Sequence, residues 1–341
     1  MKNILIVKLT AIGDVIHALP VAAALKQRYP QAHITWVVEP IAYDIVAMNK
    51  YIDEIIIFRK KEFRHLGGFL KNFRPLRKQL RSRSYDAVLD LQGLFKSAAI
   101  AAQVKAPLKL GTEWMREGSH LVSRPVKGDH AEGHIVERYL DVARELGAVP
   151  EIIDFGLEPG ERDRELAVAR LRQAGVPEGA RFAALVIGAS WPTKRWPAKK
   201  MAALCDWLYE EQIIPVLTGG GAAEAQLAGE IMGLTEVPPV NLVGATTLPQ
   251  LAAVYQEAVF AVGGDTGPAH LAAALGKRTL MLFGPTLHER NYPAGAPEDY
   301  VCADHPCRGC RRSACPKGLD CMDGIELKQV TERLAQWLKG A

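Results

Sequence analysis

Short apolar segments alternate with amphipathic segments along the whole chain. In the first half, the apolar segments have the length of buried strands, and stretches with apolar residues at helical spacing separate them. The expected strands are residues 4–7, 33–38, 54–58 and 85–91. Strands that alternate with helices form parallel sheets, so this half is predicted to be one doubly wound α/β domain. Residues 108–133 have a less regular pattern, and a helix is expected at about 134–146.

The alternation restarts after residues 147–160, which contain Pro150 and Pro159 and are interpreted as a linker. Further strands are expected at residues 182–187, 213–218 and 240–243, and a strand, turn, helix and second strand over residues 258–286. We therefore predict a domain of residues 1–150, a second Rossmann-like domain of residues 151–325, and a final amphipathic helix in 326–341. The apolar face of that helix suits packing back on the first domain.

Composition supports two globular domains and excludes several classes of protein. A chain of 341 residues exceeds the size of a typical single core, and 48% hydrophobic with 23% charged residues is ordinary for globular proteins. The net charge of +4 is too mild to indicate a nucleic-acid-binding protein. No apolar run approaches the roughly 20 residues of a membrane-spanning helix. The apolar start has no cleavage site of a signal peptide, so we expect a cytoplasmic protein.

The most informative stretch is the turn Gly263-Gly-Asp-Thr-Gly-Pro-Ala-His270, between an expected strand and helix. Asp265 and Thr266 occupy the place of a helix N-cap, and the glycines, including Gly267, let a ligand approach the backbone. The free N–H groups and positive helix end make an anion site, and His270, one turn on, would face the same ligand. An ordinary helix with a capped N-terminus would by itself account for Asp265 and Thr266. The combination favours a phosphate or nucleotide site.

Other candidate groups follow expected strands, where open α/β sheets bind ligands. Asp14 follows the first strand, in a loop with Thr10 and Gly13, and is either a general base or a helix N-cap. Lys194, beside Arg195 in a tryptophan-containing loop, suits a diphosphate or is simply solvated.

Glu224 lies after the glycine turn Gly219-Gly-Gly221, where it can accept hydrogen bonds from ribose hydroxyls. This turn lacks the remaining features of a dinucleotide fingerprint, so it supports NAD only weakly. No Asp-x-Asp occurs in the chain, and a metal-bridged nucleotide-sugar site therefore finds no support.

Residues 59–83 are strongly basic, with Glu62 as the single acid. Their cations, among them Arg59 and Arg64, suit an anionic acceptor or a membrane surface. A solvated amphipathic helix is the simpler explanation for most of these charges.

Five cysteines fall between residues 302 and 321. The set Cys307, Cys310, Cys315 and Cys321 offers four thiolates for structural zinc or an iron–sulfur cluster, and reduced thiols are the alternative. Disulfides are not expected in the cytosol.

Four motifs together resemble the ADP-heptose:lipopolysaccharide heptosyltransferases, in particular heptosyltransferase I. They are residues 4–20 (ILIVKLTAIGDVIHALP), 36–39 (WVVE), 85–97 (YDAVLDLQGLFKS) and 264–274 (GDTGPAHLAAA). The family implies an α/β GT-B fold with two Rossmann-like domains facing a central cleft. It also implies inverting, metal-independent transfer of heptose from ADP-heptose to the Kdo or inner-core region of lipopolysaccharide.

The resemblance also implies roles for individual residues. Asp14 matches the family's general base, with Thr10, Gly13 and basic residues such as Arg59 and Arg64 on the acceptor side. The expected donor contacts are Lys194, Glu224, Asp265, Thr266, Gly267 and His270. The implied partners are ADP-heptose, Kdo-lipid A or another inner-core acceptor, and the inner face of the inner membrane, without nucleic acid.

Two departures from the family leave alternatives open. The cysteine cluster is not typical of heptosyltransferase I, and residues 111–117 follow the acceptor-side segment loosely. The alternatives are a GT-B enzyme that uses another nucleotide sugar or acceptor, and a non-catalytic module that binds a nucleotide or a metal.

Overall fold

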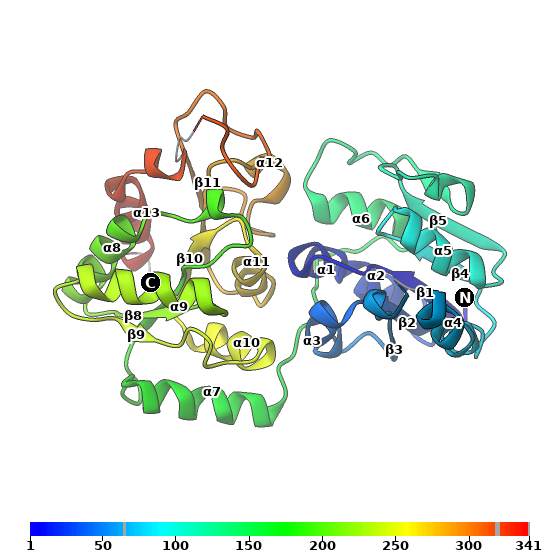
Figure 1. Ribbon diagram of the computed structural model, residues 1–341, viewed down its shortest axis with the longest axis horizontal. Helices are drawn as coiled ribbons and strands as arrows, with labels where there is room; N and C mark the ends of the chain where they lie inside the picture. Colours follow the sequence, from blue (N-terminus) through cyan, green and yellow to red (C-terminus); the bar gives the residue numbers. More distant parts are fainter. Residues whose placement is uncertain (64–65, 318–320, 340–341) are drawn as a thin grey trace. The chain divides into compact units, whose positions relative to one another are not determined.

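The structure, a computed structural model, describes residues 1–63, 66–317 and 321–339, with only the backbone at residues 66, 69 and 70. The chain forms two compact units, Met1–Glu158 and Pro159–Ala341 (Figure 1). Their boundary lies slightly beyond the predicted one, because residues 155–158 still bond to the first unit. The Asn49 side chain donates to the carbonyl of Phe155 at 2.7 Å, and the N–H of Glu158 donates to the carbonyl of Met48 at 2.9 Å.

The first unit is built on a parallel sheet with the strand order β3-β2-β1-β4-β5-β6. Its strands are β1 (Asn3–Val7), β2 (His33–Val38), β3 (Glu54–Ile57), β4 (Ala87–Asp90), β5 (Leu108–Thr112) and β6 (Arg124–Val126). In the centre, Val7 of β1 lies opposite Val37 of β2 on one side and Asp90 of β4 on the other. Every residue of β4 is buried, as expected for a strand covered on both faces.

Helices cover both faces of this sheet. They are α1 (Ile12–Ala18), α2 (Pro20–Arg28), α3 (Tyr43–Ala47), α4 (Leu66–Leu80), α5 (Phe95–Gln103) and α6 (Ile135–Arg144), with short 3-10 helices η1 (Pro40–Ala42), η2 (Lys60–Phe63) and η3 (Ser119–Leu121). The helices α1, α2 and α6 pack on one another. Leu80 of α4 and Ile100 of α5 instead join a core cluster with Leu5 and Val7 of β1.

The second unit repeats this topology with the strand order β12-β11-β10-β7-β8-β9, again parallel. Its strands are β7 (Phe182–Val186), β8 (Ile214–Thr218), β9 (Val240–Asn241), β10 (Ala261–Gly264), β11 (Thr279–Phe283) and β12 (Tyr300–Cys302). Its helices are α7 (Glu161–Ala174), α8 (Ala198–Glu210), α9 (Ala222–Leu234), α10 (Leu248–Glu257), α11 (Gly267–Ala274), α12 (His288–Asn291) and α13 (Leu327–Lys339), with η4 (Pro192–Lys194) and η5 (Cys321–Gly324). The predicted α/β class is confirmed.

The last helix, α13, differs from the expectation that it packs on the first domain. Its buried residues Val330, Leu334 and Trp337 belong to the core of the second unit, and α13 packs against α8. The Trp337 ring meets Phe260 edge-on, with ring centroids 5.8 Å apart. The sequence correctly predicts an amphipathic helix, but the apolar face of α13 packs on the second unit, to which this helix belongs.

Three strands were not expected from the sequence. β5 and β6 lie within residues 108–133, which showed no regular pattern, and β12 lies beyond the Gly284-Pro285 turn that follows β11. β5 begins with exposed Leu108 and β6 contains Pro125, so neither shows the continuous apolar run of a central strand. Parallel pairing with a neighbouring strand, rather than local sequence, places them in the sheet.

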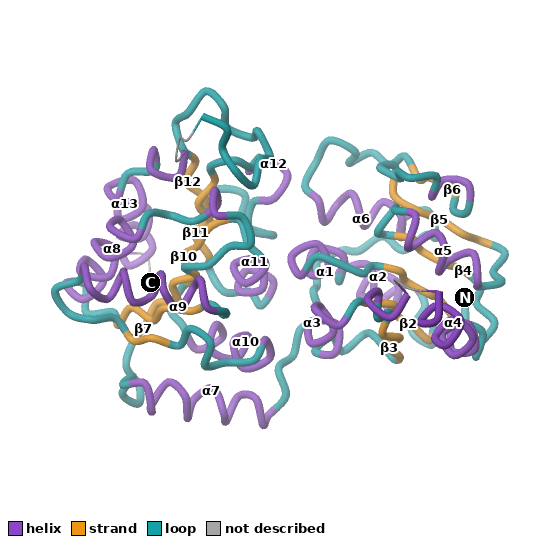
Figure 2. Tube along the Cα trace, viewed as in Figure 1, coloured by secondary structure: helices purple, strands orange, loops and turns teal. Residues whose placement is uncertain are grey.

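In both sheets, whose strands are drawn in orange in Figure 2, the order in which the chain adds strands reverses at an equivalent point. In the first sheet, the chain starts at β1 and later returns beside it at β4. In the second sheet, β7 and β10 have the same relation. Loops at the carboxyl ends of such strand pairs diverge and leave room for a ligand. The candidate residues should therefore lie after β1 and β4 and after β7 and β10.

Candidate active site

Lys194, Asp265 and His270 come together at the carboxyl edge of the second sheet. Lys194 ends η4 in the loop after β7, and Asp265 directly follows β10. The Lys194 ammonium donates to a carboxylate oxygen of Asp265 at 2.8 Å and to the Asp265 carbonyl at 2.9 Å. The other carboxylate oxygen lies 2.8 Å from Nε2 of His270, on α11. The turn predicted from the sequence is thus joined to Lys194 by an ion pair.

The carboxylate of Asp265 is held in its ionised form. It is buried, with 4% of its side chain exposed, and burial opposes ionisation. The hydrogen bond from His270 and the charges of His270 and Lys194 outweigh that effect, so the pKa of Asp265 lies far below its usual range. The cluster therefore holds the Lys194 ammonium in a fixed position at the carboxyl ends of β7 and β10.

The N-terminus of α11 lies at the turn where the sequence predicts an anion site. Thr266 is its N-cap residue, and Gly267 begins the helix. The Thr266 hydroxyl makes no capping bond. It is buried and has no hydrogen-bond partner in the described part of the chain. Buried hydroxyls are normally bonded. An unsatisfied hydroxyl beside a positive helix end suits an anionic ligand with acceptor oxygens.

Glu224 lies close to this edge, in the first turn of α9 after β8. Its carboxylate accepts a hydrogen bond from the N–H of Gly220. A Cβ atom on Gly188 or Gly219 would collide with that carboxylate, so the Glu224 carboxylate occupies the space that a side chain at either position would need. Because Gly188 follows β7, these contacts bring Glu224 next to the loop that carries Lys194.

Arg195 differs from Lys194, although the two were considered together as a diphosphate pair. Its guanidinium donates twice to the carbonyl of Ala189, at 3.1 and 2.9 Å, and so braces its own loop. The Lys194 ammonium lies 4.9 Å from the centre of the Trp191 ring. Lys194 is therefore the cation of this loop whose charge faces Asp265 at the carboxyl edge of the sheet.

Asp14 occupies the corresponding edge of the first sheet. It lies in the first turn of α1, directly after β1, and is partly exposed. Its carboxylate accepts one long hydrogen bond, 3.4 Å from the N–H of Ala11. The preceding loop is ordered by the Gln92 side chain after β4, which accepts from the N–H groups of Leu9 and Thr10. Asp14 therefore has acceptor capacity left for an incoming hydroxyl.

A buried lysine, Lys8, stabilises the loop between β1 and α1. Lys8 has 3% exposure, and its ammonium donates to Tyr139 on α6 at 2.8 Å and to the carbonyl of Leu91 at 3.2 Å. Burial lowers the pKa of Lys8, but Tyr139, Asp14 and Asp90 raise it by more, so it carries a positive charge. Lys8 ties the ends of β1 and β4 to α6.

The remaining acceptor-side candidates are less closely tied to this site. Gly13 and Thr10 flank Asp14 in the chain. Arg59 follows β3 at the same edge and is exposed, with its guanidinium 3.9 Å from Glu62. Arg64 lies outside the described residues.

The cysteines are not gathered as expected. Cys302 lies 3.3 Å from Nδ1 of His288, and Cys307 lies 3.0 Å from Nδ1 of His305. Cys310 is exposed, whereas Cys321 is buried in η5. Within residues 1–63, 66–317 and 321–339, no three His, Cys, Asp or Glu side chains are grouped to hold a metal ion.

The four-thiolate site expected at Cys307, Cys310, Cys315 and Cys321 is therefore not formed in the structure. One member of the expected set, Cys321, packs its sulfur under the turn after β11. A Cβ atom on Gly284 would lie 2.9 Å from it. Cys321 is therefore buried against this turn, whereas Cys310 is exposed.

The structure adds residues that the sequence did not single out. The Asn291 side chain, from α12, lies 3.3 Å from the Asp265 carboxylate. Thr286, after β11, has a second buried hydroxyl without a partner among the described residues. Thr286 ends the glycine-proline turn Gly284-Pro-Thr286 at this edge of the sheet. The unsatisfied hydroxyl itself is visible only in three dimensions.

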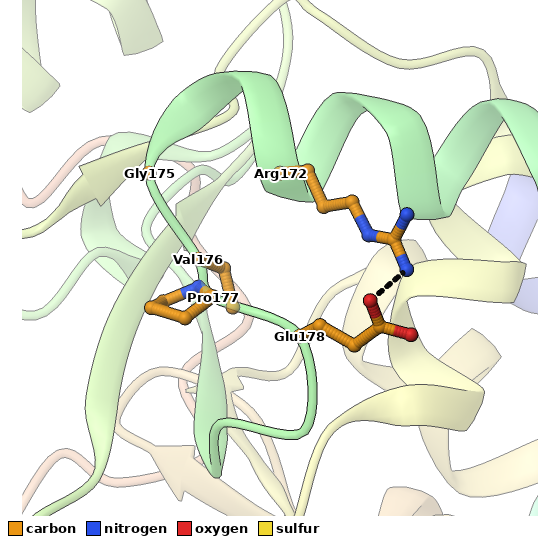
Figure 3. A pocket seen from close by; sticks show the side chains of 5 residues that line it. All are labelled: Arg172, Gly175, Val176, Pro177 and Glu178. Atoms are coloured by element: carbon orange, nitrogen blue, oxygen red, sulfur yellow. Dashed lines mark ion pairs between the residues drawn. The ribbon is translucent and has the colours of Figure 1, made fainter.

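One open pocket lies away from these groups. Arg172, Gly175, Val176, Pro177 and Glu178 line it, and the Arg172 guanidinium pairs with Glu178 at 2.8 Å (Figure 3). These residues connect α7 to the amino end of β7, opposite the carboxyl edge that carries Lys194. We assign no function to this pocket. Among the described residues, no helix combines the length and apolar character needed to cross a bilayer.

Comparison with known proteins shows the family of the chain. Residues 73–319 match glycosyltransferase family 9 (heptosyltransferase). Lipopolysaccharide heptosyltransferase 1 of Pseudomonas aeruginosa is 31% identical over 92% of this chain and 87% of its own length. The resemblance stated from the sequence motifs is thereby confirmed.

Solved structures show the same fold. A family 9 glycosyl transferase from Veillonella parvula, 23% identical, has a TM-score of 0.85 over 100% of this chain and 98% of its own. E. coli heptosyltransferase WaaC, 24% identical, gives TM-scores of 0.79 with ADP and 0.75 with ADP-2-deoxy-2-fluoro heptose, over 98% of this chain and 99% of its own. The chain therefore belongs to glycosyltransferase family 9, the heptosyltransferases, and is a glycosyltransferase with a GT-B fold.

Proposed function

We propose that this enzyme transfers heptose from ADP-heptose to the Kdo or inner-core region of lipopolysaccharide, as an inverting transferase that needs no metal ion. The observation that carries the proposal is the Lys194–Asp265–His270 cluster beside the N-terminus of α11. It presents a fixed ammonium and free N–H groups where a sugar diphosphate would bind. The relative from P. aeruginosa, whose name specifies lipopolysaccharide heptose transfer, supports the substrate class.

The second unit supplies the donor site in this proposal. The diphosphate of ADP-heptose binds the Lys194 ammonium and the N–H groups at Thr266 and Gly267, with the Thr266 hydroxyl as a further donor. Glu224 accepts hydrogen bonds from the ribose hydroxyls, and His270, on α11, borders the site. These groups meet the charge that develops as ADP leaves, which is the largest electrostatic demand of the reaction.

Asp14 supplies the base. A hydroxyl of the acceptor attacks the anomeric carbon, the bond from that carbon to the diphosphate oxygen breaks, and the Asp14 carboxylate takes the hydroxyl proton. A single attack from the face opposite the leaving group inverts the configuration. Thr10, Gly13 and cations such as Arg59 and Arg64 are proposed to lie on the acceptor side. We place the reaction in the cytoplasm, at the inner face of the inner membrane.

The test is Asp14→Asn, which keeps the shape of the side chain and removes its basicity. Transfer from ADP-heptose should fall by about 10²–10⁴-fold, the usual contribution of a general base. Binding of ADP, measured by calorimetry, should stay within about twofold of wild type, because Asp14 belongs to the first unit and the donor residues to the second.

Asp44→Asn is the matched control. Asp44 also lies in the first turn of a helix, α3, and is also partly exposed. Its substitution should leave transfer unchanged. Transfer that survives in Asp14→Asn within tenfold of wild type would remove Asp14 as the base. Transfer from another nucleotide sugar, without transfer from ADP-heptose, would instead show that ADP-heptose is not the donor substrate.

A further inference from the structure

The loop after β12 places two thiols at the ends of a short turn. Residues 303–317, the cysteine loop, carry Cys307 and Cys310, both as free thiols. Residues 306–309 form a turn, and Gly309 has a φ of +77°. A positive φ at the third residue is typical of a type II turn, which here runs from Cys307 to Cys310. The end Cα atoms of such a turn lie within about 7 Å, close to the range that a disulfide requires.

A histidine lies beside the first of these thiols. Nδ1 of His305 is 3.0 Å from the Cys307 sulfur, within hydrogen-bond reach. The N–H of Cys307 donates to the same ring nitrogen at 3.3 Å, so Nδ1 is the acceptor nitrogen and can take the thiol proton. Cys307 is partly exposed and Cys310 is exposed, so a small oxidant can reach both. Cys307 therefore has the geometry of a nucleophile with its base, and Cys310 has the position of a resolving thiol.

The other cysteines near the end of the chain are less suited to oxidation. Cys302 also lies near a histidine, 3.3 Å from Nδ1 of His288, but burial raises the pKa of Cys302 to about 11. It is therefore protonated at neutral pH and reacts slowly. Cys321 is buried in η5, and Cys315 lies outside the turn. These differences make the turn the preferred site of oxidation.

The cysteine loop is hydrogen-bonded to the loop that carries Lys194. The Thr193 hydroxyl donates to the carbonyl of Arg312 at 2.8 Å. Thr193 immediately precedes Lys194 in η4, and Arg312 lies shortly after Cys310 in the chain. A movement of Cys310 can therefore reach Lys194 through one hydrogen bond and a short stretch of backbone.

Two further contacts join the turn to the loop after β11. The N–H of Arg311 donates to the carbonyl of Pro285 at 2.8 Å, and Arg311 itself has a φ of +55°. Residues other than glycine seldom adopt this left-handed conformation, so it depends on the contacts around it. A Cβ atom on Gly309 would collide with the Leu287 side chain, which shows how closely the turn packs on that loop. The backbone on both sides of Cys310 is thus coupled to the loop after β11.

We infer that Cys307 and Cys310 form a reversible disulfide on exposure to a peroxide, and that this bond weakens the binding of the ADP-containing donor. The inference rests on the proposed function for the identity of the donor. A permanent disulfide is not expected in a reducing compartment, but transient disulfides that sense oxidants occur there. The second unit thereby has a modification site that is separate from the groups proposed to bind the donor.

The reaction balances with hydrogen peroxide as the oxidant. His305 takes the thiol proton of Cys307, the sulfur attacks one peroxide oxygen, and the O–O bond breaks. Cys307 becomes a sulfenic acid, and the departing hydroxide takes the proton from His305 to give water. The Cys310 sulfur then attacks the Cys307 sulfur, the S–O bond breaks, and a second water leaves with the Cys310 proton. Two thiols are oxidised to one disulfide, and one peroxide is reduced to two waters.

The disulfide should loosen the support of the proposed donor site. Linked sulfur atoms lie about 2.05 Å apart, closer than unbonded sulfur atoms approach, so the bond draws Cys310 toward Cys307. The residues that directly follow Cys310 move with it, and their hydrogen bonds to Pro285 and Thr193 should weaken. Because Thr193 precedes Lys194, the affinity for ADP should fall by about three- to tenfold, the effect of roughly one lost hydrogen bond.

The experiment treats the reduced full-length protein with hydrogen peroxide and then blocks the remaining thiols with iodoacetamide. Trypsin cuts after Arg308, so the disulfide joins two peptides, one with Cys307 and one with Cys310. Mass spectrometry detects the joined peptides as one species. Calorimetry on the same samples should show ADP binding that is about three- to tenfold weaker after oxidation and is restored by dithiothreitol.

Three variants separate the steps. Cys310→Ser should give no joined peptides and should bind ADP equally before and after peroxide. His305→Asn should slow formation of the disulfide by about tenfold or more, because the base is lost, and should reach the same product. Cys315→Ser is the matched control, a cysteine of the same loop outside the turn, and it should respond to peroxide as wild type does.

Two results would overturn the inference. They are the absence of joined peptides after peroxide, and joined peptides with unchanged affinity for ADP. A metal ion that the purified protein retains, and that keeps both thiols from reacting, would overturn it as well. A reduced protein that binds no ADP would instead refute the proposed donor site, and the joined peptides would still report the disulfide.

Discussion

Asp265→Asn is the substitution that most directly tests how the donor edge is held together. It preserves the size of the side chain and removes its negative charge. In the structure, that charge faces the Lys194 ammonium and His270 Nε2, each at 2.8 Å, and the Asn291 amide at 3.3 Å. The variant leaves Lys194, whose side chain is 17% exposed, without its counter-charge.

The expected cost follows from the burial of the pair. Removal of one partner from a buried ion pair costs about 3–5 kcal/mol, and the partial exposure of Lys194 places this case near the lower end. A loss of about 3 kcal/mol lowers Tm by about 6–12 °C for a unit of this size. The control is Asp299→Asn, whose partner Arg278 lies at 3.4 Å and is 52% exposed, and it should cost less than about 1 kcal/mol.

The cost should depend on pH in a definite direction. The pKa of Asp265 is depressed in the folded state, because the His270 and Lys194 interactions outweigh its burial. Its contribution to stability is therefore complete above the pKa of an unfolded aspartic acid, about 4, and is lost as the pH falls through the folded pKa. The difference between wild type and variant should be constant above about pH 5 and should shrink below about pH 4.

Differential scanning calorimetry is the suitable assay, because the two units can unfold in separate transitions. ADP should raise only the transition of the unit that binds it, which identifies the second unit. Asp265→Asn should lower that transition and leave the other in place. A shift below about 2 °C, or one equal to that of Asp299→Asn, would refute the claim that this carboxylate organises the donor edge.

Three further substitutions test single features of the same edge. Lys194→Met should weaken ADP binding about tenfold or more in calorimetry, since a charge-assisted hydrogen bond is lost, whereas exposed Lys199→Met should not. Gly188→Ala should weaken ADP binding by pushing the Glu224 carboxylate aside, and normal affinity would contradict its place in the site. Thr286→Val should weaken ADP binding about five- to tenfold if its unsatisfied hydroxyl serves the donor. Unchanged affinity with a higher Tm would instead show that this hydroxyl meets only protein.

Much of the fold was predictable because parallel α/β units carry a local signal. Buried strands such as β1 and β7 are continuous apolar runs, and amphipathic helices separate them, so both halves and their class were evident from the sequence. The same holds for the turn at residues 263–270, where cap, glycines and histidine are neighbours in the chain. Resemblance to known heptosyltransferases then supplied the activity, which no local pattern contains.

Two kinds of feature could not be predicted in this way. They are the outer strands of a sheet and the surface against which an amphipathic helix packs. β5, with an exposed first residue, and β6, with Pro125 at its centre, become strands because a neighbouring strand offers parallel hydrogen bonds. The apolar stripe of α13 was evident, but whether it covers the first or the second unit depends on which surface has the complementary shape. The cysteines near the end of the chain illustrate the same limit, because spacing alone did not reveal that Cys321 packs inward.

The sequence by itself determined the architecture, the position of the candidate anion-binding turn and Asp14 as a candidate base, because each depends on residues close together in the chain. Tertiary structure decided which of these residues act together. Lys194 and Asp265 are 71 residues apart and form an ion pair only because β7 and β10 are adjacent in the sheet. Gln92 likewise reaches the loop before Asp14 only because β4 is a neighbour of β1. Strand order, which depends on the packing of the whole chain, sets these distances.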